Sequence, residues 1–284
     1  MMAIVRSKRQ SRVAGWARYS ALAVGAVLFL IPFYLLLRSA FMREQDLGSP
    51  DFHWLPPQWE TANLTGLFSN PAIPMARSLL NSGLISVTQT IGVLVISGLA
   101  GYGLARIPYR WSNAVFYFIT ATLLIPAAVT FVPSFVLVST LGWISTLRGL
   151  IIPGLFQALA TFLFRQFFLG FPKEIEEAAF IDGLGYWGTF WKIVVPNSMG
   201  FVAAIGTITF IGSWNAFLWP HVIGRDQESW TVQIALSTFL TAQSVQVSQL
   251  FMAALVAIVP LLLMFLFLQR WIVEGVERTG IAGD

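Results

Sequence analysis

The sequence contains no cysteine and only two histidines, His53 and His221, in 284 residues. Without cysteine the chain can form no disulfide and no thiolate-ligated metal site. The two histidines lie far apart and lack the spacing of zinc ligands. We therefore expect no metal site and no thiol chemistry.

Lysine is scarce as well, and its positions are informative. A phosphate-binding loop of the Walker A type needs Gly-Lys followed by Ser or Thr, so that backbone N–H groups and the lysine surround the phosphates. The residues preceding the lysines Lys8, Lys173 and Lys192 are serine, proline and tryptophan. We therefore expect no ATP hydrolysis and no cofactor on this chain.

Charged residues make up only 11% of the chain, whereas 56% are hydrophobic and the mean hydropathy is +0.73. A membrane-spanning helix needs about 20 apolar residues. The stretches that approach this length are 17–37, 79–105, 113–139, 149–169, 199–220 and 250–270. This pattern predicts an all-α integral membrane protein with six transmembrane helices. The expected organisation is a tail at 1–16, a single membrane domain at 17–270 and a tail at 271–284.

Two further patterns concern the interior of these spans. The segment Ser97–Gly103 is rich in small residues and is suited to close packing between helices. Proline interrupts the helical hydrogen bonding, so a helix can kink or unwind at such a position. The prolines within or beside the predicted spans are Pro126, Pro133, Pro153, Pro220 and Pro260.

The distribution of basic residues predicts the topology. Placing the N-terminus in the cytoplasm puts most of the 17 lysines and arginines on the inner side. Those left outside are Arg38, Arg43, Arg77, Arg148 and Arg225. The positive-inside rule therefore favours cytoplasmic termini. The net charge of +4 does not indicate nucleic-acid binding, because the basic residues flank hydrophobic spans.

A polar island at 172–196 separates the fourth and fifth predicted spans. Pro172 can open a helix, and the carboxylates that follow it favour a helix N-terminus. Gly183 and Gly185 indicate a turn, after which an amphipathic helix resumes and ends near Pro196. We expect two short helices with an acidic, small-residue bend exposed between them.

This island resembles the cytoplasmic EAA loop of the permease subunits of ABC importers. The family's pattern falls on Glu177, Ala178, Ala179, Gly183, Ile193 and Pro196, with Val195 where leucine is usual. Ile181, Asp182 and Gly183 further resemble the carbohydrate-uptake branch, of the maltose type. The resemblance implies a coupling-helix loop between helices 4 and 5. It also implies that Glu177 pairs with a basic residue of the ATPase, that Ala178 and Ala179 fit its cleft, that Gly183 permits the turn and that Asp182 is a further contact.

The same resemblance implies partners and location. An importer of this kind combines a second permease, commonly a different chain, with two ABC ATPase subunits that use ATP and Mg, and an external solute-binding protein. The expected location is the prokaryotic cell membrane, in contact with lipid. Solute would cross by alternating access.

Candidate solute contacts are the polar residues of the spans, since unsatisfied polar groups are costly in hydrocarbon. Asn81, Trp214 and Asn215 fit a sugar, which an indole face and directed amide hydrogen bonds can bind. The alternative for each is a hydrogen bond to a neighbouring helix. Ser82, Gln89 and Gln157 are open to the same two interpretations.

Two other classes of protein remain as alternatives. An ion-coupled secondary transporter usually carries ionisable groups within its spans. All 13 Asp and Glu residues here lie in predicted loops or tails, which argues against that class. A membrane assembly protein would not explain the spacing of the loop motif. The importer permease is therefore the favoured hypothesis.

Overall fold

The structure is a computed structural model that describes residues 8–241 and 246–280. Within these residues every regular element is a helix and no strand occurs, which confirms the all-α prediction. The chain divides into two units. The first unit comprises the described residues of Met1–Ser69 and Phe239–Val256, and the second comprises those of Asn70–Thr238 and Ala257–Asp284. Each unit is described by itself.

The first unit begins with α1 (Lys8–Ala40), followed by α2 (Glu44–Leu47) and α3 (Ala62–Ser69). The part of α1 at Arg18–Ala40 has a mean hydropathy of 2.4 and is long enough to cross a membrane. The loop after α1 folds back on the end of that helix: Arg38 donates to the carbonyl of His53 at 2.7 Å, and the Tyr34 hydroxyl donates to that of Trp54.

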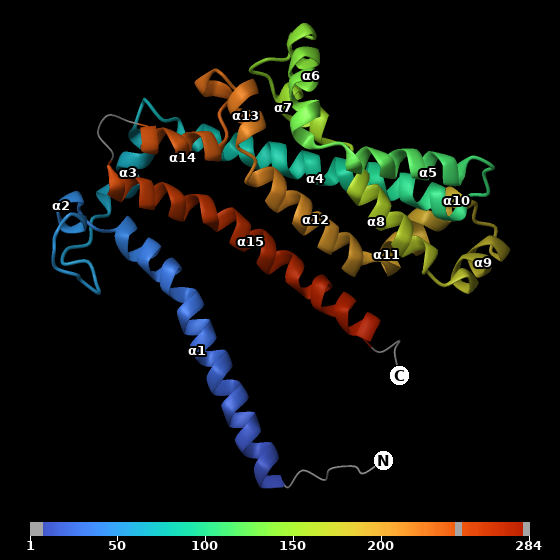
Figure 1. The fold of residues 1–284 in the computed structure, drawn as a ribbon, viewed down its shortest axis with the longest axis horizontal. Helices are drawn as coiled ribbons and strands as arrows, with labels where there is room; N and C mark the ends of the chain where they lie inside the picture. Colours follow the sequence, from blue (N-terminus) through green and yellow to red (C-terminus); the bar gives the residue numbers. More distant parts are fainter. Residues whose placement is uncertain (1–7, 242–245, 281–284) are drawn as a thin grey trace. The chain divides into compact units, whose positions relative to one another are not determined.

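The second unit is built on α4 (Met75–Arg106), which packs against both α8 (Ala158–Leu169) and α12 (Met199–Trp214), as Figure 1 shows. The approach of α4 to α8 is closest at Gly101. A Cβ atom there would lie 2.6 Å from the Cβ of Phe164 and 2.8 Å from the backbone nitrogen of Arg165. The close packing predicted for Ser97–Gly103 is thus confirmed at Gly98 and Gly101, whereas a Cβ at Gly103 would meet open space.

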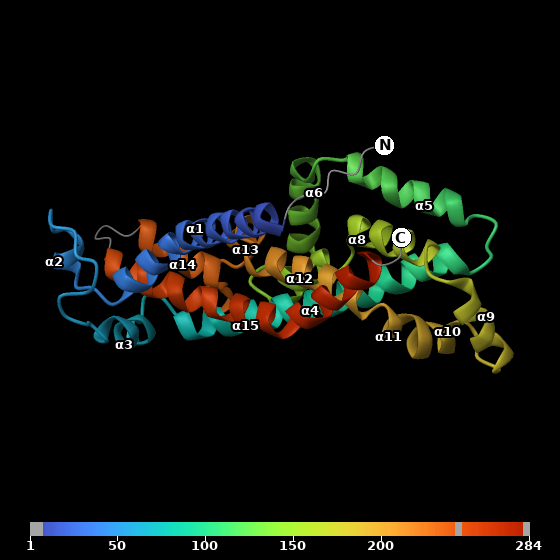
Figure 2. The ribbon, with the colours of Figure 1, turned by 90° about the horizontal axis from the view of Figure 1, so that it is seen from below.

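Three more apolar segments are bent pairs of helices, and one of them joins Tyr186–Asn197 to Met199–Trp214 at 81°. The axis of α6 (Ala127–Thr140) is bent by 99° from that of α5 (Ser112–Ala121) and η1 (Thr122–Leu124). Figure 2 shows this sharp bend. The break lies at Pro126, which has no N–H to continue the helix and holds Ile125 extended. The elements α7 (Leu147–Ile151) and η2 (Ile152–Gly154) meet α8 at 40°. The predicted spans at 113–139 and 149–169 are therefore broken helices.

The remaining elements refine the predicted boundaries. Helix α12 ends at Trp214, so the helix predicted over 199–220 is interrupted before α13 (Leu218–Ile223). The chain continues with η4 (Gln227–Ser229), α14 (Val232–Thr241) and α15 (Val247–Gly280). Pro153 lies in η2, and Pro133, Pro220 and Pro260 lie inside helices.

Within residues 8–241 and 246–280, the length and composition of the helices allow three continuous membrane spans, or up to six if each bent pair crosses once. The predicted tails at 1–16 and 271–284 fall partly outside the described residues, at 1–7 and 281–284. The rest of both tails belongs to α1 and α15.

Candidate functional site

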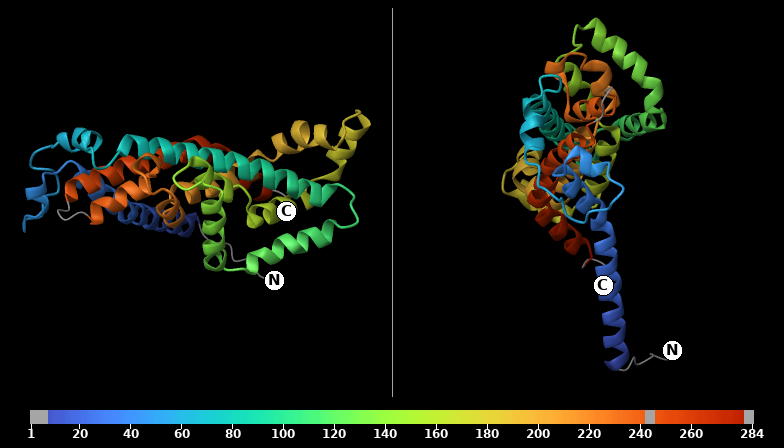
Figure 3. Two further views of the ribbon diagram at one scale, coloured as in Figure 1. Left: turned by 90° about the horizontal axis from the view of Figure 1, so that it is seen from above. Right: turned by 90° about the vertical axis from the view of Figure 1, so that its left-hand side faces the viewer.

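The polar island forms two short helical segments joined by a turn. Helix α9 (Lys173–Ile181) starts directly after Pro172, with Glu174 and Glu176 in its first turn. The second segment consists of α10 (Tyr186–Thr189), the π-helical η3 (Phe190–Val194) and α11 (Val195–Asn197). The left view of Figure 3 shows this loop, in yellow, at the C-terminal end of α4. The predicted pair of short helices is present.

Gly183 makes the turn between these segments. Its φ of +85° lies in the left-handed region that favours glycine. The N–H of Gly183 donates to the carbonyl of Phe180 and that of Leu184 to the carbonyl of Ala179, both at 3.0 Å. This pair of bonds is a Schellman motif, which ends α9 and satisfies its last carbonyl groups.

The side chains of α9 divide into an outer and an inner set. Glu174, Glu177, Ala178, Ile181 and Asp182 are exposed, so the outward face carries three carboxylates, one small residue and one isoleucine. Ala179 is only 4% exposed and lies against the protein. The loop thus presents three carboxylates to any partner, Glu174 in the first turn of α9 and Glu177 and Asp182 closer to the bend, together with one short side chain.

Glu176 points inward and meets Arg106, the last residue of α4. The Arg106 Nε lies 3.1 Å from a carboxylate oxygen of Glu176, and both side chains are less than one-tenth exposed. Arg106 also donates to the carbonyl of Phe171, immediately before α9. Burial raises the pKa of Glu176, while the charge of Arg106 acts in the opposite direction. Sequence reasoning missed this pair, because no local pattern joins two residues so far apart in the chain.

An aromatic cluster beside the ion pair holds both ends of the loop to α4. Tyr102 lies one helical turn before Arg106, and its ring centroid is 5.7 Å from that of Phe168, at the end of α8. The same ring is 5.1 Å from Phe190, where the second segment of the loop becomes π-helical. The chain therefore enters and leaves the loop against one face of α4.

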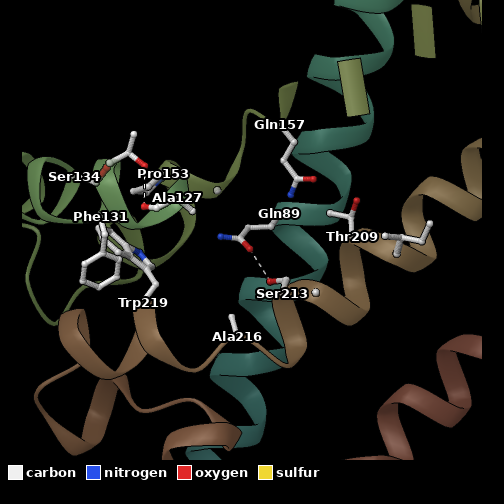
Figure 4. A pocket seen from close by; sticks show the side chains of 14 residues that line it. Gln89, Ala127, Phe131, Ser134, Pro153, Gln157, Thr209, Ser213, Ala216 and Trp219 are labelled. Carbon is white, nitrogen blue, oxygen red and sulfur yellow. Dashed lines mark hydrogen bonds between the residues drawn. The ribbon is translucent and has the colours of Figure 1, made fainter. Parts of the chain in front are cut away.

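A pocket of about 500 Å³ lies elsewhere in the second unit, where α4, α6 and α12 approach the break before α8 (Figure 4). Its lining includes amide and hydroxyl side chains together with two aromatic rings. These residues are Gln89, Thr130, Phe131, Ser134, Gln157, Thr209, Ser213 and Trp219. Hydrogen-bonding groups and apolar rings in one cavity suit a solute that has both hydroxyl groups and a carbon face.

Gln89 of α4 is held in place at the pocket wall. Its amide nitrogen donates to the carbonyls of Leu150 and Ile151 at 3.0 and 3.2 Å, and its amide oxygen accepts from the Ser213 hydroxyl at 2.6 Å. A Cβ at Gly154 would come within 2.4 Å of the same amide nitrogen. Gln89 therefore ties α4 to the break before α8 and to α12.

The residues predicted to contact solute lie elsewhere, and none of them lines this pocket. Asn81 is buried, and its amide nitrogen donates to the carbonyls of Glu228 and Trp230 at 2.8 and 2.9 Å. Trp214 is 2% exposed and donates its indole N–H to the carbonyl of Ala257 at 3.2 Å. Their bonds within the protein match the structural alternative, and a role in the solute pathway stays a prediction.

Asn215 differs from these two residues because its side chain is exposed. Its amide oxygen accepts from Gln233 at 3.1 Å. Of the other intramembrane polar residues, Ser82 accepts from the backbone N–H of Val232, whereas Gln89 and Gln157 reach the pocket. The hydroxyl groups of the pocket carried no sequence signal, because serine and threonine are tolerated throughout membrane helices.

Comparison with known proteins identifies the family of this chain. Residues 92–278 match the profile described as binding-protein-dependent transport system inner membrane component. The chain is 31% identical over 260 residues to the sn-glycerol-3-phosphate transport system permease protein UgpE of Yersinia pestis bv. Antiqua (strain Antiqua), covering 89% of this chain and 92% of that protein. It is 32% identical over 265 residues to UgpE of Agrobacterium fabrum, covering 91% and 94%.

Two further similarities extend the comparison. The chain is 34% identical over 203 residues to the arabinooligosaccharides transport system permease protein AraQ of Halalkalibacterium halodurans, covering 72% of this chain and 73% of that protein. A chain from the crystal structure of a bacterial ABC transporter involved in the import of the acidic polysaccharide alginate has the same fold. It superposes with a TM-score of 0.80 at 19% identity, covering 93% of this chain and 98% of that chain. The chain belongs to the family of inner membrane permease components of binding-protein-dependent transport systems.

Proposed function

We propose that this permease forms one half of the translocation pathway for a sugar or a sugar-like solute and works by alternating access. The relatives are named as permeases for sn-glycerol-3-phosphate and for arabinooligosaccharides, both rich in hydroxyl groups. The amides, hydroxyls and rings of the pocket suit that class of solute. The pocket is the proposed part of the pathway on this chain.

The proposed topology has six crossings, with each bent pair counted once, and cytoplasmic termini. The 172–196 loop then faces the cytoplasm, where ATP is available. The bias of lysine and arginine toward that side supports this arrangement. Helices broken at membrane depth are tolerated where they are packed against protein or line a cavity, as the break before α8 does.

The exposed acidic face of α9 is the observation that carries the proposed coupling to ATP. Two ABC ATPase subunits, which bind ATP and Mg, would dock on this loop and on that of a second, different permease. Glu177 would pair with a basic residue of the ATPase, with Ala178 in the contact and Asp182 beside it. Ala179, which is buried, would pack α9 against the permease, and Gly183 would form the turn that ends α9. An external solute-binding protein would deliver the solute.

Reconstitution of the permease with its ATPase and receptor tests this proposal. Ala178→Trp places a large side chain on the exposed face of α9, so it should leave membrane insertion intact and abolish solute-stimulated ATP hydrolysis. Glu174→Gln, on the same helix, serves as a matched control and should retain stimulation. Ion-driven uptake by the permease alone, or normal stimulation in Ala178→Trp, would contradict the proposal.

The absence of cysteine from the chain allows a direct test of sidedness. Asp182→Cys adds a single thiol at an exposed position of the loop. An impermeant maleimide should label this thiol in inside-out membrane vesicles and not in intact cells. Labelling from outside would place the loop on the wrong face of the membrane for contact with ATPases.

A further inference from the structure

Helix α4 joins the two functional regions without a break. Arg106 stands at its C-terminus beside the loop, and Gln89 lies 17 residues earlier at the wall of the pocket. At 1.5 Å per residue this separation is about 26 Å. The intervening segment packs against α8 and α12, and Val93 and Tyr102 lie in the same buried cluster as Phe164 and Phe168.

We propose that the buried Arg106–Glu176 ion pair fastens the coupling loop to α4, and that α4 carries the displacement of the loop to Gln89 in the pocket. Both residues are positioning residues, since neither lines the pocket and both side chains are buried. The proposal rests on the proposed function of the loop. It adds the mechanical connection and the residues that make it.

Arg106 bridges the first turn of α9. Its guanidinium contacts the carboxylate of Glu176 and the carbonyl of Phe171, so it holds both the start of the helix and the backbone that precedes it. A planar guanidinium with several donors is suited to such a bridge, whereas a lysine would offer a single charged point. Loss of either charge would leave the other buried without its partner.

Glu176 and Glu177 of α9 point to different sides of the helix. Successive residues of an α-helix differ in direction by about 100°. Glu176 is buried against α4, whereas Glu177 is exposed on the face available to an ATPase. A force applied to Glu177 and Ala178 is therefore transmitted through one helical turn to Arg106.

The covalent connection from the loop to α12 is less direct than this non-covalent contact with α4. The segment from α10 to α11 meets α12 at 81°, with Ser198 outside the helical region at φ −109° and ψ 12°. In contrast, α4 is a single helix of 32 residues. The aromatic contacts of Tyr102 with Phe168 and Phe190 further oblige both ends of the loop to move with α4.

The ratio of solute transported to ATP hydrolysed, in proteoliposomes containing the complete importer, tests this inference. Glu176→Gln and Arg106→Gln should each lower the ratio by about tenfold, within the range by which single residues alter coupling between sites. The double variant should lose no more than either single variant, because both changes break one interaction. Glu174→Gln, an exposed carboxylate on the same helix, should leave the ratio unchanged.

A reversible link separates this role from a role in folding. In a variant with Arg106→Cys and Glu176→Cys, a reducible bis-thiosulfonate crosslinker should restore the ratio, and its reduction should lower it again in the same sample. The inference would be overturned by an unchanged ratio in the single variants or by a parallel loss of hydrolysis and transport. It would also be overturned if neither the cysteine pair nor Glu176→Gln assembled into the importer. Failure of the proposed function would instead appear as no solute-stimulated hydrolysis in the unmodified importer.

Discussion

Replacement of Gly183 by alanine should weaken docking of the ATPase through backbone strain alone. The φ of +85° places an L-residue in the left-handed region, at a cost of about 1–2 kcal/mol. No atom lies within 4 Å of the Cβ that alanine would add, so no steric clash contributes. The free loop can relieve the strain by relaxing the turn, whereas the docked loop must keep it. The affinity for the ATPase should therefore fall by up to about 5- to 30-fold, the factor to which this energy corresponds.

The measurement is the binding of purified ATPase subunits to the permease pair in lipid nanodiscs. Gly185→Ala is a matched control, because Gly185 has a φ of −86° and equally open surroundings. Gly183→Asn should fall between glycine and alanine, since asparagine tolerates the left-handed region better. Equal effects of Gly183→Ala and Gly185→Ala would refute the argument that the docked loop keeps this turn.

Two further predictions concern stability. Gly101→Ala should lower the thermal unfolding midpoint, because overpacking against Phe164 costs about 1–3 kcal/mol. Gly103→Ala, which adds its methyl group in open space on the same helix, should leave the midpoint unchanged. Equal midpoints for the two variants would contradict the close packing at Gly101. Burial raises the pKa of Glu44, but hydrogen bonds from Ser248 and its neighbour outweigh this, so the pKa falls below its ordinary value of 4.5. The Glu44 carboxylate then stabilises the fold above pH 4.5 and loses this effect as the pH falls through its lowered pKa. Glu44→Gln should therefore reduce the loss of unfolding free energy as the pH falls below 4.5. An unchanged dependence of stability on pH in this acidic range would contradict the prediction.

The loop illustrates how far sequence reasoning reached. Pro172 and the carboxylates after it indicated the start of α9, and Gly183 indicated its end. Both signals act through the few residues around them, because helix starts and left-handed turns depend on local backbone geometry. The inward direction of Glu176 gave no such signal, since its neighbours Glu174 and Glu177 have the same chemistry and are exposed.

The polar residues of the spans show the same limit. Sequence reasoning identified Asn81, Gln89, Gln157 and Trp214 as polar groups in apolar surroundings that need partners. It could not tell which of them bond to the backbone of another segment and which line a cavity. That distinction depends on which helix lies opposite, and residues distant in the chain supply it.

The sequence by itself determined that this protein is a helical membrane permease, because apolar length, the positions of basic residues and the loop motif are each written in consecutive residues. The tertiary structure decided where the broken helices bend, which polar groups converge on a pocket, and that Arg106 and Glu176 meet beneath the loop. These features depend on close packing between segments that are remote in the chain. Local propensities have no means to encode such contacts, since each acts over only a few residues.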